Sequence, residues 1–128
     1  MEQAFRDILT GDAAVAALAT GGVNWGAHPQ GQPLPAVVLF LVSGAGGHTL
    51  DGPNRLFEGR VQIDCYAQDY GTAKRLSRAV IAALDGHAGG VFQRIFWASS
   101  RDLRDATYSE AAERPFRMSL DFLVTANV

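Results

Sequence analysis

The sequence predicts an α+β domain, an antiparallel β-sheet of about four strands with the main helix packed on one face and a short helical N-terminus. Two patterns lead to this prediction. Residues 57–67 alternate between apolar and polar side chains, which is typical of a strand with one buried face. Residues 69–84 then change to helical spacing, with an apolar stripe on one side. A chain of 128 residues has the size of one domain, so we expect a single domain over 1–128.

The first half is predicted to hold two short helical segments and one strand. Apolar residues recur at helical spacing over 5–9, and Asp12 is placed to cap a second segment. Residues 23–35 are rich in proline and glycine and predict an irregular connection. Residues 36–44 predict a strand that is apolar on both faces, so we expect cover on both sides, by this domain or another subunit. The glycine-rich residues 44–54 predict a loop.

The second half supplies the main helix and two further strands. Asp69 is the expected N-cap of the helix and Gly86 its expected stop. Residues 91–103 and 114–126 predict the third and fourth strands, and the polar residues 104–113 between them predict a long hairpin loop.

Composition excludes several classes of function. The net charge is only −2 and the charges are scattered, which argues against a basic nucleic-acid surface or a polybasic membrane patch. A single cysteine cannot form an intramolecular disulfide. The longest apolar run, 36–42, is strand-sized, far below the ~20 residues of a membrane-spanning helix, and the N-terminus has no apolar signal core. We therefore expect a soluble, cytoplasmic protein.

The stretch 48–67 holds the residues that could be catalytic. Cys65 with His48 as its base would match the arrangement of cysteine hydrolases. However, Cys65 shares a strand face with Val61 and Ile63, and a buried cysteine in an apolar strand behaves as a small hydrophobic residue. We therefore predict that Cys65 lies in the core.

The same stretch could also bind a metal through His48 and two aspartates. Yet Asp51, followed by glycine, is typical of a turn, and Asp64 projects to the polar strand face, where it can pair with a cross-strand arginine. His28 and His87 add no recognised ligand spacing. We expect no metal and no cofactor.

Two further patterns also do not indicate a catalytic or ligand-binding site. The glycine runs do not end in the Gly-Lys-Ser/Thr of a phosphate-binding loop. Asp102 and Asp105, with Arg101 and Arg104 interleaved, predict a solvated and self-neutralising charge cluster. The doubly apolar strand, the long glycine-rich loop and the alternating charges on polar strand faces favour a surface where subunits dock. No catalytic residue is predicted.

Several stretches of the chain resemble the small tail-completion (tail-terminator) proteins of long-tailed phages and gene transfer agents. The most specific are HTLDG at 48–52, RVQIDC at 60–65 and ALDG at 83–86, and the similarity runs from the first helix almost to the C-terminus. These are patterns of fold rather than of chemistry.

The resemblance implies a structural virion protein without enzymatic activity. Its relatives form a ring, typically sixfold, which caps the head-proximal end of the tail tube, ends tail polymerisation and offers a surface for head–tail joining. The implied partners are further copies of the chain, the tail tube protein and a head-side neck or connector protein. Assembly in the host cytoplasm and a place in the tail–neck region of the virion are implied too, with no membrane contact. DNA would pass through the lumen without being read, which suits the near-neutral charge.

The expected contact surfaces follow from this resemblance. The doubly apolar strand would face or support a neighbouring subunit, and residues 44–54 and 101–113 would reach the tube or the neck. The candidate interface residues are Val38, Phe40, Val42, His48, Asp51, Arg55, Arg60, Asp64, Arg101, Asp102 and Arg104.

Three other interpretations remain open from sequence. The protein could be another ring-forming head-completion or neck protein of similar build. It could be a small enzyme that uses Cys65 or His48, or a dimeric ligand-binding α+β domain with an apolar pocket.

Overall fold

A computed structural model describes residues 2–28, 33–49, 52–104 and 115–127, and at 45–49, 52–55 and 103–104 it describes the backbone alone. The described part holds three helices and five strands. In chain order these are α1 (Glu2–Thr10), α2 (Ala13–Leu18), β1 (Val23–Trp25), β2 (Ala36–Thr49), β3 (Gly52–Ala67), α3 (Tyr70–Leu84), β4 (Phe92–Arg104) and β5 (Phe116–Asn127).

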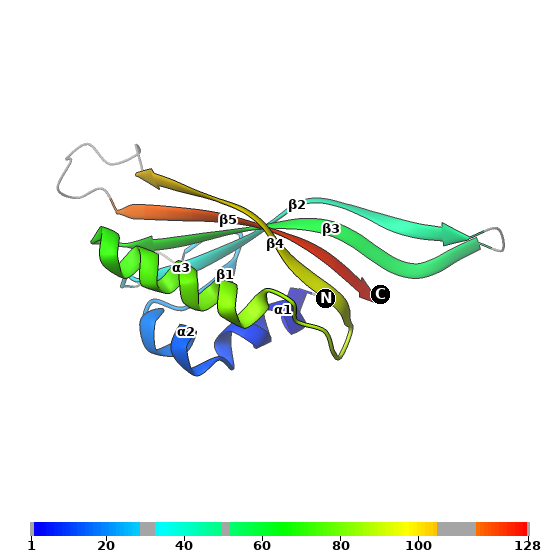
Figure 1. Ribbon diagram of the computed structural model, residues 1–128, viewed down its shortest axis with the longest axis horizontal. Coiled ribbons are helices and arrows are strands. Elements are labelled where there is room, and N and C mark those ends of the chain that lie inside the picture. Colours follow the sequence, from blue (N-terminus) through cyan, green and yellow to red (C-terminus); the bar gives the residue numbers. More distant parts are fainter. Residues whose placement is uncertain (1, 29–32, 50–51, 105–114, 128) are drawn as a thin grey trace.

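The strands form one sheet in the order β1-β2-β3-β5-β4. β2, β3, β5 and β4 pair antiparallel in that order, and β1 pairs parallel with β2. All three helices lie on one side of the sheet (Figure 1). We call the covered side the helix face and the other side the open face. The predicted α+β class, with the main helix on one sheet face, is confirmed.

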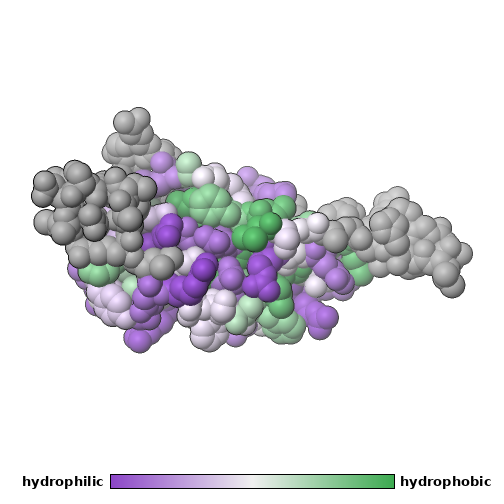
Figure 2. All heavy atoms as spheres, turned by 90° about the horizontal axis from the view of Figure 1, so that it is seen from above, coloured by the Kyte–Doolittle hydropathy of each residue, from purple (hydrophilic) through white to green (hydrophobic). Residues whose placement is uncertain are grey.

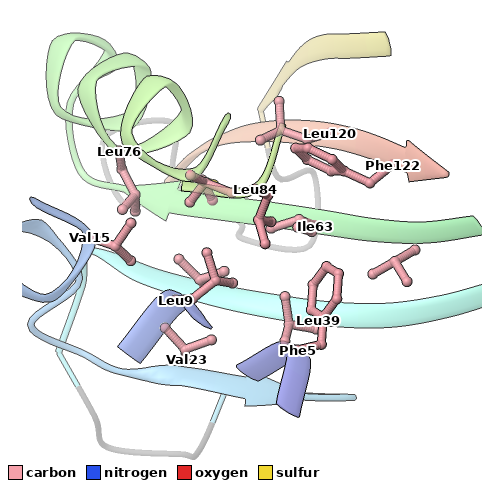
Figure 3. Close-up of a cluster of buried hydrophobic side chains, with 14 of the residues drawn as sticks. Phe5, Leu9, Val15, Val23, Leu39, Ile63, Leu76, Leu84, Leu120 and Phe122 are labelled. Atoms are coloured by element: carbon pink, nitrogen blue, oxygen red, sulfur yellow. The ribbon is translucent and has the colours of Figure 1, made fainter. Parts of the chain in front are cut away.

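The core lies between the helices and the helix face of the sheet. The odd positions of β3, from Val61 to Ala67, are buried there, as their alternation predicts. Large apolar side chains from α1, α3 and the central strands meet in this layer, including Phe5, Leu76 and Phe122 (Figure 3). Their burial is the main favourable contribution to folding.

The residues predicted to begin and end the helices do so in the structure. Asp12 accepts a hydrogen bond from the Val15 N–H at 3.0 Å, and Asp69 accepts one from the Thr72 N–H at 2.9 Å. The bond from the Thr72 backbone is the main reason that the pKa of Asp69 is lowered. After α3, Gly86 takes a φ of 80°, which glycine adopts without strain.

The structure contains one strand that the sequence does not predict. This strand, β1, falls in the segment 23–35, which was expected to be irregular. β1 is held in place by neighbours on both sides. Val37 donates its N–H to the Gly22 carbonyl at 3.0 Å, and the Arg6 guanidinium bonds the Val23 carbonyl at 2.7 Å. A strand of three residues is too short to give a period-two signal, so the pairing comes from tertiary contacts.

The glycine-rich segment 44–54, predicted as a loop, is strand in all of its described residues. β2 continues to Thr49 and β3 begins at Gly52, so the two strands form a long hairpin that extends away from the helices (Figure 1). The predicted hairpin loop at 104–113 also begins too early, because Arg104 still belongs to β4 and the rest of that segment lies outside the described residues. None of the described helices has the length and apolar character needed to cross a membrane.

Candidate assembly surfaces

Cys65 is fully buried in β3, as predicted. Burial, together with the neighbouring Asp64 carboxylate, raises the pKa of its thiol far above the usual range. A nucleophilic cysteine needs the thiolate, so the environment of Cys65 opposes this chemistry. The described residues also contain no group of three His, Cys, Asp or Glu side chains that could hold a metal ion.

Asp64 lies on the open face, directly beside Cys65 in sequence but on the other side of the sheet. Its carboxylate is 1% exposed, accepts a hydrogen bond from the Gln62 amide at 3.1 Å, and lies 3.7 Å from the Arg117 guanidinium of β5. The sequence predicts this cross-strand arginine partner, and the geometry agrees. Asp64 therefore ties β3 to β5, and as an interface residue it would act through Arg117 rather than by touching a partner itself.

A second network of polar side chains on the open face connects β3, β5 and β4. The Arg60 guanidinium lies 3.3 Å from the Asp121 carboxylate, which also accepts a hydrogen bond from the Ser99 hydroxyl at 3.3 Å. Arg60 therefore belongs to a surface network inside one subunit, with its side chain 42% exposed. Such partly solvated pairs add little stability but fix the position of the charges.

The open face also carries apolar side chains that the described part of the subunit leaves exposed. Phe96 and Leu123 are 45% and 44% exposed there. Two further apolar side chains of β2 are exposed, Val42 at a β-bulge (53%) and Leu41, which pairs with Val61 and so faces the helix side (44%). Phe96 and Leu123 are cross-strand neighbours, so they form one patch. Figure 2 shows hydrophobic residues gathered among hydrophilic ones on this side of the molecule.

A hollow of about 470 Å³ adjoins this patch. It is lined by Ser43, Glu58, Gly59, Arg60, Arg94, Phe96, Leu123, Val124 and Thr125. The lining mixes two arginines and a glutamate with the apolar patch, which resembles a surface for protein contact more than an apolar ligand pocket.

The predicted apolar strand 36–42 divides into two parts in the structure. Val38 is 3% exposed, so it could only pack beneath residues that touch a partner. Phe40 is half-buried and Val42 is exposed. A β-bulge between Leu41 and Ser43 marks the change. Beyond it β2 leaves the cover of the helices, which is why the apolar run does not end inside the core.

The charge cluster predicted at 101–105 is arranged differently from expectation. Arg101 faces the open side with Ser119 as its cross-strand neighbour, whereas Asp102 faces the helix side. There the Asp102 carboxylate accepts hydrogen bonds from Lys74 and Tyr70, both at 2.9 Å. The bond to Asp102 raises the pKa of Lys74, and the bonds from Lys74 and Tyr70 lower the pKa of Asp102. Among the described side chains, Asp102 thus pairs with the main helix and not with Arg101, because neighbouring strand residues point to opposite faces.

The other candidates lie in the outer hairpin and at the end of β4. His48 and Arg55 belong to the two strands of the hairpin, and Arg104 ends β4. The structure describes their backbone only, and Asp51 lies outside the described residues. Sequence reasoning missed the exposed pair Phe96 and Trp97. The signal was available, since two adjacent aromatic residues in a strand point to opposite faces.

Residues 3–126 match the family model described as "Tail completion protein gp17". A chain of a solved structure described as "Virion of native gene transfer agent (GTA) particle" is similar in fold, with a TM-score of 0.68 and 25% sequence identity. The match covers 97% of this chain and 92% of that chain. None of the curated proteins matches.

Proposed function

The chain belongs to the family of tail completion protein gp17, and on this premise we propose that it forms a ring that caps the head-proximal end of the tail tube in a phage or gene-transfer-agent particle. The ring ends tail polymerisation and offers the surface on which the head is joined. The observation that carries this proposal is the family match over residues 3–126, which spans nearly all of the 128 residues.

The surfaces described above support an assembly role over an enzymatic one. The single cysteine is sealed in the core, and no metal-binding group exists among the described side chains. The open face instead exposes apolar residues such as Phe96 and Leu123 beside arginines, a composition that suits subunit contact. The similar chain in a gene-transfer-agent virion is likewise part of a multi-protein particle.

The proposed mechanism is capping by binding. One end of the ring imitates a layer of tube subunits and binds the last layer, while the other end lacks the surface on which a further layer could add. The hairpin of β2 and β3 extends beyond the helices and is the element best placed to reach the tube or the neck (Figure 1). His48 and Arg55 belong to this hairpin, and the third candidate, Asp51, lies between them in sequence but outside the described residues. Arg101, Asp102 and Arg104, at the far end of β4, would contact the other partner.

The charge of the chain agrees with a conduit for DNA. The net charge of −2 provides no strong attraction for phosphates, so DNA would pass through the lumen of the ring without tight binding or base recognition. A ring of closed cyclic symmetry also needs two different patches on each subunit that meet between neighbours.

Electron microscopy of particles from cells that lack only this protein tests the proposal. Over-long tails beside DNA-filled heads without tails are expected, because nothing would stop tube growth or join the head. Restoring the unaltered protein from a plasmid should return normal particles and serves as the control. Tails of normal length beside unjoined heads would instead assign the protein to the neck, and normal infectious particles would refute a structural role.

A further inference from the structure

The outer edge of β2 is largely unpaired within the described residues. β1 covers only Val37–Leu39, and the last backbone bond on that side runs from the Gly26 N–H to the Leu39 carbonyl at 2.8 Å. From Phe40 to Thr49 no described segment pairs with this edge. This stretch contains no Asp, Glu, Lys, Arg or Pro. Proteins usually protect a free edge with such residues, so this edge is open to another strand.

The outer edge of β4 is free only in its second half. In the first half, the connection after α3 folds along the strand. Ile95 exchanges backbone bonds with this connection, accepting from the Gly86 N–H at 2.8 Å and donating to the His87 carbonyl at 3.1 Å. The Trp97 N–H donates to the Asp85 carboxylate at 2.9 Å. Among the described segments none pairs with the outer side of Ala98–Arg104.

The two free edges are diagonal to each other across the sheet. Phe40 pairs with Gln62, Gln62 with Asp121, and Asp121 with Ser99, so Phe40 and Ser99 lie at the same level on opposite edges. From this level the free part of β2 runs toward the hairpin tip, and the free part of β4 runs the opposite way. Joining one edge to the other therefore requires neighbouring sheets to be displaced along the strands. Closed barrels have this stagger, because their strands tilt by roughly 35–45°.

We propose that the free half of β4 in one subunit pairs antiparallel with the free half of β2 in the next, so that the sheets of the ring form one continuous wall. This proposal rests on the ring of the proposed function and names the surfaces that close it. Three antiparallel steps separate β2 from β4, so the two strands run in opposite directions. Rotation about a ring axis preserves these directions, and the contact is therefore antiparallel.

A second copy of the chain is the occupant that fits both edges at once. Each subunit carries one free edge of each kind, which is the condition for a head-to-tail contact that closes on itself. Bulges at Leu41/Ser43 and Trp97/Ser99 mark the start of the two free edges. Bulges bend strands and are a common means of giving a sheet the curvature that closure needs. The exposed apolar side chain of Val42 would be covered by the incoming strand.

Disulfide trapping between two variants of the full chain tests this contact. Ser43→Cys is mixed with Arg101→Cys or, separately, with Ser99→Cys, and the mixture is oxidised and run on a non-reducing gel. All three positions face the open side, because their cross-strand neighbours are Arg60, Ser119 and Asp121. A covalent dimer is expected in at least one mixture, several-fold above controls. Native Cys65 does not compete, since it is fully buried.

Two matched controls separate edge pairing from random collision. Ser100→Cys lies between the two test positions but faces the helix side, opposite Leu120, so it should not react with Ser43→Cys. Leu123→Cys is exposed on the same open face but lies on the interior strand β5, so it should not react either. Yields equal to these controls would overturn the proposal. Cross-linking of a single variant with itself would overturn it too, because that result requires a two-fold contact.

Failure of this inference and failure of the proposed function are distinguishable. Over-long tails in the deletion strain together with no edge cross-link would leave the capping role intact and refute only the pairing of β4 with β2. Edge cross-links together with normal particles in the deletion strain would support the contact and refute the capping role.

Discussion

Asp64 and Cys65 are adjacent residues whose side chains experience opposite environments. Cys65 is enclosed among apolar side chains on the helix face, whereas Asp64 is equally buried on the open face but is satisfied by Gln62 and Arg117. The alternation of a strand accounts for the difference. One residue contributes packing and the other contributes a charge pair that links two strands, and neither supplies a reactive group.

Removing the Asp64 carboxylate should destabilise the fold. Asp64→Ala removes one ionic partner of Arg117, whose side chain is 31% exposed, and leaves a gap at a buried position. We expect a loss of about 1–3 kcal/mol in the free energy of unfolding, measured by urea denaturation. Asp121→Ala is the control, because its pair with the more exposed Arg60 should cost only about 0–1 kcal/mol. An Asp121 variant that loses more stability than the Asp64 variant would contradict this ranking.

The Cys65 thiol should be unreactive in the folded protein. Because burial raises its pKa, the thiol stays protonated at neutral and mildly alkaline pH, and labelling by a thiol reagent should require unfolding. In the unfolded chain the thiol ionises near its ordinary pKa of about 8.5. The raised folded-state pKa therefore contributes stability that is present below that pH and is lost as the pH rises above it.

Both effects of Cys65 can be measured on one sample. Labelling in buffer should be slow and should become rapid in concentrated urea, and the free energy of unfolding should fall above about pH 8.5. A Cys65→Ala variant should lack that part of the alkaline loss. Rapid labelling of the native protein at pH 7 would restore the interpretation of Cys65 as a reactive residue.

At the scale of elements, the base of the hairpin depends on two glycines that face each other. Gly44 and Gly59 are cross-strand partners, and the ring of Phe57 occupies the space where their side chains would stand. A Cβ on Gly59 would come within 2.6 Å of that ring and 2.7 Å of the Ser43 carbonyl oxygen. These glycines thus serve a packed strand pair, and the aromatic ring covers the helix face of the hairpin where the helices no longer reach.

Gly59→Ala should therefore weaken the hairpin. The backbone carbonyl of Ser43 cannot move away without disturbing the ladder, so we expect a cost of about 1–3 kcal/mol by thermal or urea unfolding. Gly71→Ala is the matched control in the first turn of α3, where the nearest atoms lie 3.5 Å or more from the added Cβ. That change should be neutral or stabilising by up to about 1 kcal/mol. Equal effects of the two substitutions would argue against the close packing of Phe57.

The elements that the sequence predicts well are those long enough to repeat their apolar pattern several times. β3 and α3 each carry enough alternating or helical spacing to fix both their type and their buried face. β1 has only three residues, so its existence depends on Val37 and Arg6 bonding its neighbourhood rather than on its own pattern. The outer hairpin was mistaken for a loop because glycine is usually a breaker, and the role of Phe57 above Gly44 and Gly59 depends on a cross-strand partner that the sequence does not reveal.

At the scale of the molecule, the contact that we propose is a pair of strand edges rather than a cluster of side chains. Phe40 and Val42 are predicted as interface residues from sequence, because an apolar run on both faces of a strand needs cover. The availability of β4 could not be found this way. It depends on which backbone groups the connection at Asp85–His87 already occupies, and that follows from the fold of a distant segment. Asp102, a candidate chosen by charge, pairs with Lys74 and Tyr70 of its own subunit while 45% of its side chain stays exposed.

A head-to-tail ring has a genetic consequence that depends on which edge is damaged. Val42→Lys places a charge on the free edge of β2, where it would be covered in the assembled ring, but leaves the β4 edge intact. Such a subunit can still join a neighbour through β4 and then leaves its other contact open. Co-expressed with the unaltered protein, it should act as a dominant inhibitor and lower the yield of tailed particles.

The double variant Val42→Lys with Ser99→Lys damages both edges, cannot join, and should be recessive. Leu123→Lys, at a similarly exposed apolar position inside the sheet, should not inhibit through the edges. Particle counts by electron microscopy would decide the matter. A double variant as inhibitory as the single one would show that inhibition does not proceed through incorporation at the β4 edge, and that the subunits meet by a different pair of surfaces.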